Sequence, residues 1–196
     1  MSLATVRGAI AAYLNYGTGT QTQDAAIPGL NKIYRAQPTF IDPTQWWILP
    51  PELGAGTVGY LHLAKVDEDR IALPAVEGVK FVEYVVALVL IYRYQIPSGT
   101  QATPYEGDEW VDGQDETVEA IKAWIRKDPN LGTSPTTLFT GQPGVIYGQY
   151  PGAIWQAGQT PGDLSMTADP PVRDEEGGEV LSFQVLEFHA TEAITA

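Results

Sequence analysis

The chain has 196 residues, and its 24 acidic residues outnumber its 11 basic ones, which gives a formal net charge of −13 at pH 7. So negative a surface repels nucleic-acid phosphates, which excludes duplex binding as the main activity. The absence of cysteine excludes disulfides, thiol nucleophiles and cysteine metal clusters, and the longest apolar run, Val85 to Ile91, is far shorter than the roughly 18 residues of a membrane span.

Hydrophobic residues make up 44% of the chain, and we predict a single domain over residues 1–196. The first residues contain one basic side chain, Arg7, and lack the cationic start and apolar block of a secretory signal. We therefore expect the protein to stay where it is made.

The first part of the chain predicts an amphipathic helix, a linker and a strand. Ser2 is a suitable helix cap, and the polar stretch from Gly17 to Asp24 follows the helix as a linker. Leu30 to Gln37 predicts a first strand, and the Pro-rich stretch from Thr39 to Gly56 predicts a long loop. The apolar residues of the helix are Leu3, Val6, Ile10, Tyr13 and Leu14.

Two longer strands are predicted next. Val58 to Val66 has a strand pattern, and the acids Asp67, Glu68 and Asp69 are expected in the turn after it. Val79 to Ile96 includes the apolar run and is therefore expected to be a central strand, buried on both faces.

A second helix is predicted around residues 118–125, with Asp112 or Asp115 as its cap and Arg126 and Lys127 in its last turn. Trp124 lies on its apolar face and is expected to join the core.

The last third of the chain predicts a Pro-Gly-rich hairpin region and a final strand. Pro143 to Tyr147 is echoed eight residues later by Pro151 to Trp155, and Pro161-Gly162 closes the series, which predicts a projecting or edge hairpin. The final strand is Glu179 to Ala193. Its alternating pattern changes phase near Val185, which indicates either a β-bulge or burial on both faces.

These elements together predict an α+β fold: a mostly antiparallel or mixed sheet, two main helices packed on one face, long loops and a projecting hairpin region.

Two motif matches fail in context. Residues 54–59 match the dinucleotide fingerprint, but prolines precede them and a strand pattern follows, where a helix is required. Residues 108–119 match a calcium loop at four positions, but Trp110 occupies the third position and no helix is expected before it. Helix-capping acids explain the second match better. We predict no metal site and no cofactor.

Support for catalysis is weak. The histidines His62 and His189 have neither a serine elbow nor metal-ligand spacing nearby, so no catalytic residue is assigned. A pair of acids meeting across a cleft, as in a hydrolase, remains an alternative.

Six aromatic residues fall in predicted loops or short strands flanked by turns. Aromatics in loops either hold the loop to its own core or anchor a partner, and a sugar-binding β-domain would use the same residues. The candidate interface residues are Trp46, Trp47, Trp110, Tyr147, Tyr150 and Trp155.

Several short segments, spread over most of the chain, resemble tail terminator proteins of long-tailed (siphovirus-type) actinobacterial phages. They consist of core and turn residues and contain no catalytic motif. The segments are Met1 to Arg7, Ile27 to Leu30, Gly59 to Leu63, Arg70 to Pro74 and Val185 to Phe188.

The resemblance implies a non-enzymatic virion protein, made in the host cytoplasm, at the head-proximal end of the tail. Such a protein forms a homo-oligomeric ring, usually of six copies, on the tail tube protein, stops tube polymerisation, and presents its other face to the head connector or neck protein. DNA passes through the ring without specific binding, and Asp67, Glu68 and Asp69 are candidate acids of its lumen. Another neck or tail-tube component, or a carbohydrate-binding or adhesion module, is the alternative.

Overall fold

The computed structural model describes residues 3–16, 27–39, 56–70, 79–95, 108–127, 144–147, 164–174 and 179–195. The elements in chain order are α1 (Leu3–Tyr16), β1 (Leu30–Tyr34), β2 (Gly56–Arg70), β3 (Val79–Gln95), α2 (Asp108–Lys127), β4 (Gly144–Tyr147), β5 (Ser165–Ala168), β6 (Val172–Asp174) and β7 (Glu179–Thr195).

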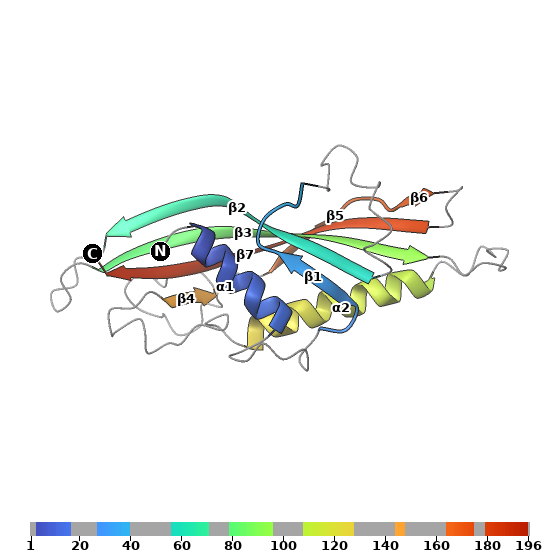
Figure 1. The fold of residues 1–196 in the computed structure, drawn as a ribbon, viewed down its shortest axis with the longest axis horizontal. Coiled ribbons are helices and arrows are strands. Elements are labelled where there is room, and N and C mark those ends of the chain that lie inside the picture. The colour runs from blue at the N-terminus through green and yellow to red at the C-terminus, as the bar shows by residue number, and fades with distance from the viewer. Residues whose placement is uncertain are drawn as a thin grey trace.

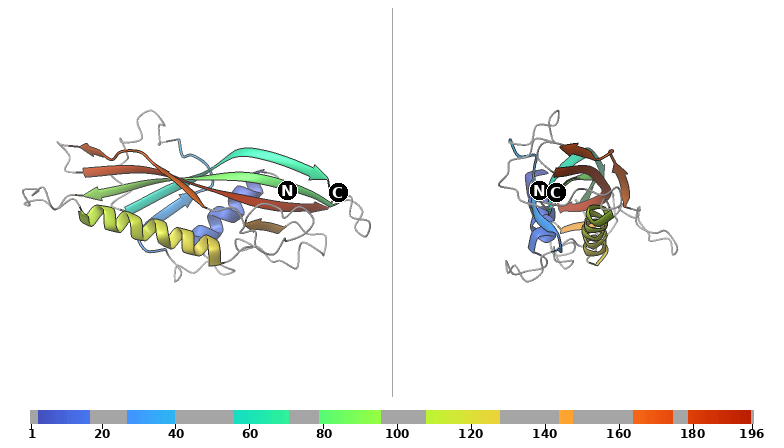
Figure 2. Two further views of the ribbon diagram at one scale, coloured as in Figure 1. Left: turned by 180° about the vertical axis from the view of Figure 1, so that it is seen from behind. Right: turned by 90° about the vertical axis from the view of Figure 1, so that its right-hand side faces the viewer.

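The strands form one mixed sheet in the order β1-β2-β3-β7-β4, and β5 and β6 pair with β7 on the same side as β4. β1 runs parallel to β2, and the other described pairs are antiparallel. Both helices lie on one face of this sheet (Figure 1, Figure 2). The predicted α+β fold, with a mixed sheet and two helices on one face, is confirmed.

Strand β3 lies at the centre of the sheet, as predicted. Its 17 residues pair with β2 on one side and with β7 on the other. Residues 86 to 93 are all buried, so neither face of this stretch is open to solvent. A strand that is apolar on both faces is stable only in such a position.

The acids Asp67, Glu68 and Asp69 lie within strand β2, so their predicted position in a turn is wrong. β2 continues to Arg70 and pairs with β3 along its whole length, with a register shift between Leu63 and Lys65. The local sequence resembles a turn because it is polar, but the long ladder to β3 supplies backbone hydrogen bonds that keep it extended.

Helix α2 begins at Asp108, earlier than the sequence predicted, so neither Asp112 nor Asp115 is its cap. Both are exposed residues inside the helix, where acids near the N-terminus are favoured by the helix dipole. The helix ends with Arg126 and Lys127 in its last turn, as predicted. Residues 108–119, which match a calcium loop in sequence, are helical throughout.

The main core lies between the helices and the inner face of the sheet, which we define as the face that carries α1 and α2. Leu61, Leu88 and Leu186 occupy one row across β2, β3 and β7, and all three are buried. Helix α2 adds Ile121 and Ile125 to the same cluster. These leucine and isoleucine side chains fix the helices on this face.

The two helices also contact each other. The Tyr13 hydroxyl donates a hydrogen bond of 2.7 Å to the Trp124 carbonyl, and the two rings meet edge to face at 5.7 Å. Trp124 is half-buried and packs against the main core, which agrees with its predicted role.

Strand β7 pairs with β3 without a register shift from Glu179 to Thr195. The bulge considered for its phase change is therefore wrong, and burial on both faces is correct. Leu186 and Phe188 belong to the main core, whereas Leu181 belongs to a second buried cluster on the opposite face.

The first half of the predicted Pro-Gly hairpin is strand β4, which pairs with β7 at residues 190–193. The linker at residues 17–24, most of the predicted loop at residues 39–56 and the second half of the hairpin lie outside the described residues. The exposed strand β5 and the three-residue β6 were not predicted.

Gly59 provides a test of the packing between β1, β2 and β3. A Cβ there would lie 2.7 Å from Ile33 Cδ1 and 2.9 Å from both Leu90 Cδ2 and the Val89 carbonyl oxygen. We expect Gly59→Ala to lower the free energy of unfolding by about 1–3 kcal/mol in urea denaturation, because overpacking forces the strands apart. Gly8→Ala is the control, because nothing lies within 4 Å of its Cβ in helix α1. It should be neutral or stabilising, and equal losses in both variants would contradict this account.

Candidate functional site

The face of the sheet away from the helices, here called the outer face, carries a second apolar cluster. Its members are neighbours across four strands: Tyr34 pairs with Tyr60, Tyr60 with Val89, and Val89 with Val185. We define the outer patch as Tyr34, Tyr60, Val89, Ile91, Leu181, Phe183 and Val185.

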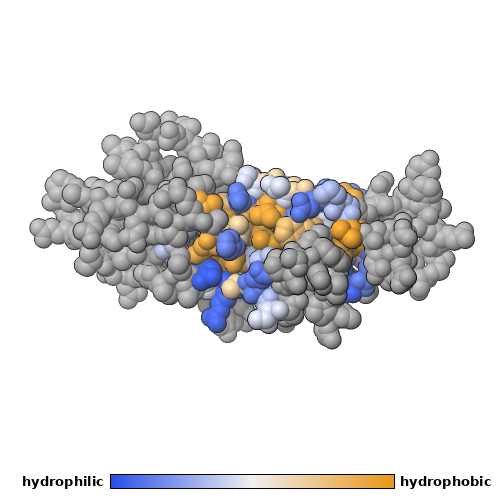
Figure 3. Space-filling model, turned by 90° about the horizontal axis from the view of Figure 1, so that it is seen from above, coloured by the Kyte–Doolittle hydropathy of each residue, from blue (hydrophilic) through white to orange (hydrophobic). Residues whose placement is uncertain are grey.

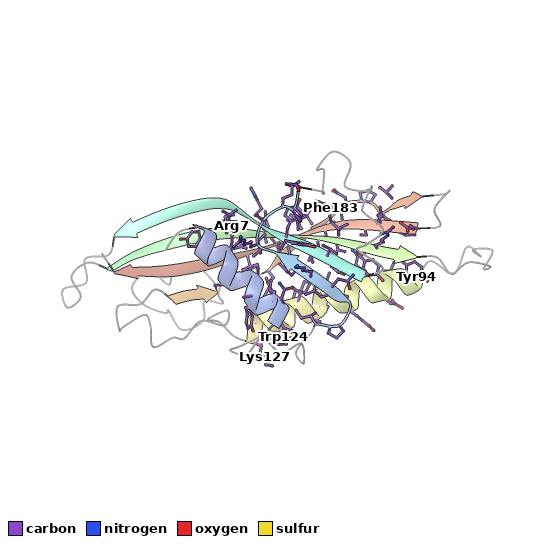
Figure 4. All side chains as sticks on the ribbon, in the orientation of Figure 1. Arg7, Tyr94, Trp124, Lys127 and Phe183 are labelled. Atoms are coloured by element: carbon purple, nitrogen blue, oxygen red, sulfur yellow. The ribbon has the colours of Figure 1, made fainter. Side chains whose placement is uncertain are left out.

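The outer patch has a buried centre and a half-exposed margin. Ile91 is 0% exposed and Tyr60 is 8% exposed, whereas Tyr34, Phe183 and Val185 are only partly buried. Burial raises the pKa of the Tyr60 hydroxyl above its usual value of 10.0. Figure 3 shows apolar side chains gathered in the middle of this side of the molecule, and Figure 4 places Phe183 across the sheet from Trp124 and Lys127.

A buried ion pair borders the patch. Arg93 Nη2 lies 2.6 Å from Glu179 Oε1, and Arg93 Nε donates a hydrogen bond of 2.9 Å to Glu179 Oε2. The arginine side chain is only 7% exposed. Because Arg93 stands opposite Leu181, this pair joins β3 to the start of β7 at the margin of the patch. A buried charge with three hydrogen bonds to its partner fixes this geometry.

Exposed charges of opposite sign stand at two other margins of the patch. Lys32 and Arg35, at the β1 side, are both exposed, and Lys32 Nζ lies 4.9 Å from the centre of the Tyr34 ring. Asp169 and Glu187, at the β5 side, are also exposed. We call these two groups the basic end and the acidic end of the sheet. Lys32 stands in register with Val58 on the outer face, whereas Arg35 directly follows the end of β1.

Asn15 of helix α1 hydrogen-bonds to backbone groups at the free edge of β1, on the side away from β2. Its side-chain Nδ2 donates to the Ile33 carbonyl at 2.7 Å, and its Oδ1 accepts from the Ile33 N–H at 2.8 Å. The side-chain amide therefore takes the place that a neighbouring strand would fill at Ile33. An edge strand covered in this way cannot pair there with another chain.

The predicted interface aromatics lie mostly outside the described residues. Trp46, Trp47, Tyr150 and Trp155 lie outside the described residues, and Trp110 and Tyr147 are placed by their backbones alone, in α2 and β4.

The candidate lumen acids, Asp67, Glu68 and Asp69, lie in the C-terminal half of β2. There Asp67 stands opposite Glu83 of β3, so acidic residues face each other across the ladder.

The outer patch was not predicted, although two features of the sequence point to it. The central strand was predicted to be buried on both faces, and the alternation of Leu181, Phe183 and Val185 marks one face of the last strand. Combining these two patterns would have placed an apolar surface opposite the helices.

No group of three metal-ligating side chains gathers within the described part of the chain. Neither described helix is long and apolar enough to cross a membrane. Comparison with protein-family models and with curated proteins found no match to this chain.

The two ion pairs allow a matched test of burial. Arg93–Glu179 and Lys122–Glu119 both have contacts of 2.6 Å, but Glu119 is 65% exposed. We expect Glu179→Gln to lower the free energy of unfolding by about 3 kcal/mol, because it leaves Arg93 buried without its counter-charge. Glu119→Gln should cost less than about 1 kcal/mol. Urea denaturation measures both, and similar values would show that the Arg93 pair is effectively solvated.

Removing the Asn15 amide should open the edge of β1. Asn15→Ala is expected to lower the free energy of unfolding by about 1–3 kcal/mol, because two backbone groups of Ile33 lose their partner. Hydrogen exchange followed by NMR should show faster exchange of the Ile33 amide in this variant. Asn15→Asp keeps the acceptor and should retain part of the protection. Unchanged exchange in Asn15→Ala would show that Asn15 does not close this edge.

Proposed function

We propose that this chain is a tail terminator subunit of a long-tailed phage. Copies of it assemble as a ring, of six subunits by the family resemblance, on the end of the tail tube. The ring stops tube polymerisation and provides the surface for head-to-tail joining. The protein acts through its contact surfaces, as a structural component of the virion.

The first support is the position in the fold of the residues that resemble this family. The described ones lie mostly in α1, before and at the start of β1, in β2 and in β7. Many of them build the main core, including Ile27, Leu61, Leu186 and Phe188, which are at most 2% exposed. The resemblance is therefore carried by residues that determine the fold.

The observation that carries the proposal is the outer face. It presents an apolar patch four strands wide, with half-exposed aromatic and aliphatic side chains and charged residues at its margins. An apolar centre with a polar rim is the usual composition of a protein–protein contact. The half-exposed Tyr34 and Phe183 side chains in this patch are suitable anchors for a partner.

The acidic character of the chain fits a ring through which DNA passes. Asp67, Glu68 and Asp69 lie together on β2, and the register sets Asp67 opposite Glu83. If this part of the sheet lines the lumen, its negative charge repels the phosphates and keeps the DNA from adhering.

The test is assembly in solution and on tubes. Light scattering coupled to size exclusion, over a concentration series, should give a mass near six times 21.3 kDa. Added during polymerisation of the tail tube protein, the ring should shorten the tubes. A protein that stays monomeric and leaves tube length unchanged would exclude the proposed function, and glycan binding by that monomer would favour an adhesion module.

A matched pair of variants connects assembly to the outer patch. Val185→Lys places a charge at the half-exposed margin of the patch and should abolish ring formation and the effect on tube length. Ala123→Lys makes the same change in charge at an exposed position of α2 and should assemble like the parent chain. Circular dichroism and thermal melting check that both variants fold. Equal assembly of the two would show that the patch is not the contact.

A further inference from the structure

The charge at the outer face changes sign from one side of the sheet to the other, along one row of residues. Lys32 stands opposite Val58, Val58 opposite Ile91, and Ile91 opposite Phe183. The Asp169 N–H donates a hydrogen bond of 3.0 Å to the Phe183 carbonyl, so Asp169 continues the row. The row therefore begins with an exposed cation, crosses the apolar patch and ends with an exposed anion.

We infer that neighbouring subunits of the ring meet head to tail, with the basic end of one sheet (Lys32 and Arg35) against the acidic end (Asp169 and Glu187) of the next. This inference rests on the proposed function for the existence of a ring, and it identifies the surfaces through which the ring closes. The partner at each end is a second copy of this chain.

The two ends do not neutralise each other within one subunit. Lys32 and Asp169 are separated by four strand spacings, which is roughly 19 Å at about 4.8 Å per spacing. This exceeds the Debye length of about 8 Å at physiological salt, so their mutual attraction is largely screened. Each end is left with charge that a closer partner can use.

The position of the ends fits the symmetry of a ring. They lie on opposite sides of one sheet, so the contact between a basic end and an acidic end joins two different surfaces. Such a heterologous contact, repeated by rotation, closes a ring. A two-fold dimer with antiparallel outer faces would also set each basic end against an acidic end, so the ring is taken from the proposed function, and the covalent test below separates the two because a dimer gives no multimer larger than two.

Side chains make this contact, without strand addition at Ile33. Asn15 already bonds both outer backbone groups of Ile33, which closes the edge of β1 at this residue. Lys32 and Arg35 remain exposed beside it. The half-exposed margin of the patch, at Tyr34 near the basic end and Phe183 near the acidic end, adds apolar area to both surfaces.

Charge reversal tests the inference. Lys32→Glu with Arg35→Glu gives a subunit with two acidic ends, and Asp169→Lys with Glu187→Lys gives one with two basic ends. Either double variant alone should need at least a tenfold higher concentration for half-assembly, because like charges meet at every contact. Mixed in equal amounts, they should form rings again, since acidic and basic subunits alternate. The chain with all four changes should also assemble.

Arg126→Glu with Lys127→Glu is the matched control, since it reverses two exposed cations at the end of α2 and should leave assembly unchanged. Failure of the mixture and of the fourfold variant to assemble, with both folded, would overturn the inference. If charge reversal changes assembly as expected but the rings do not limit tube length, the contact stands and the proposed function fails. If the parent rings limit tubes and no reversal matters, only the contact is wrong.

A covalent test covers contacts that form only briefly. The chain has no cysteine, so Lys32→Cys with Asp169→Cys introduces one defined pair. A disulfide needs Cα atoms within about 7 Å, which excludes a bond across roughly 19 Å within one subunit. Mild oxidation should give a ladder of multimers that ends at the ring size on a denaturing gel. The control pair, Lys127→Cys with Asp169→Cys, should give no ladder. The contact would be contradicted if the Lys32→Cys, Asp169→Cys variant gave no ladder, or if the control pair gave an equal one.

Discussion

The fold depends on the antiparallel ladder that joins β3 to β2 and β7. All 17 residues of β3 pair with β7, and most of them also pair with β2. Because side chains alternate along a strand, a central strand with an apolar run such as Val85 to Ile91 needs cover on both faces. Helices α1 and α2 cover the inner face, and the outer patch is the consequence on the other face.

The inner face is not uniformly apolar, and its polar part helps to position α2. Thr57, Tyr92 and Ser182 form one row across the sheet, and Gln114 of α2 donates a buried hydrogen bond of 2.8 Å to Ser182. Burial, with a smaller contribution from Tyr94, raises the pKa of Tyr92 above 10.0. Directional bonds of this kind specify how a helix docks, whereas leucine packing alone tolerates sliding.

The sequence predicted those helices and strands whose buried side chains recur at a regular spacing. The central strand, the N-terminal helix and the last strand are apolar at regular spacing, and all three were recovered. The acids before residue 118 and after residue 66 hid the start of α2 and the end of β2, because acidic runs are typical of caps and turns. β5 has four exposed side chains and so no alternation. Predicting the members of the outer patch requires the register of the strands, since its residues come from four strands far apart in sequence.

The sparse basic residues give the outer face its direction. A chain with net charge −13 repels its own copies, so attraction between copies must come from local charge arrangement and apolar contact. Lys32 and Arg35 are two of only 11 basic residues, and both lie at the β1 side of the patch. With anions at the opposite side, approach is favourable in one relative orientation and unfavourable in the reverse. In the proposed ring, the long central strand would thus supply the apolar area, and the charges at the two ends of the sheet would select the orientation in which two copies meet.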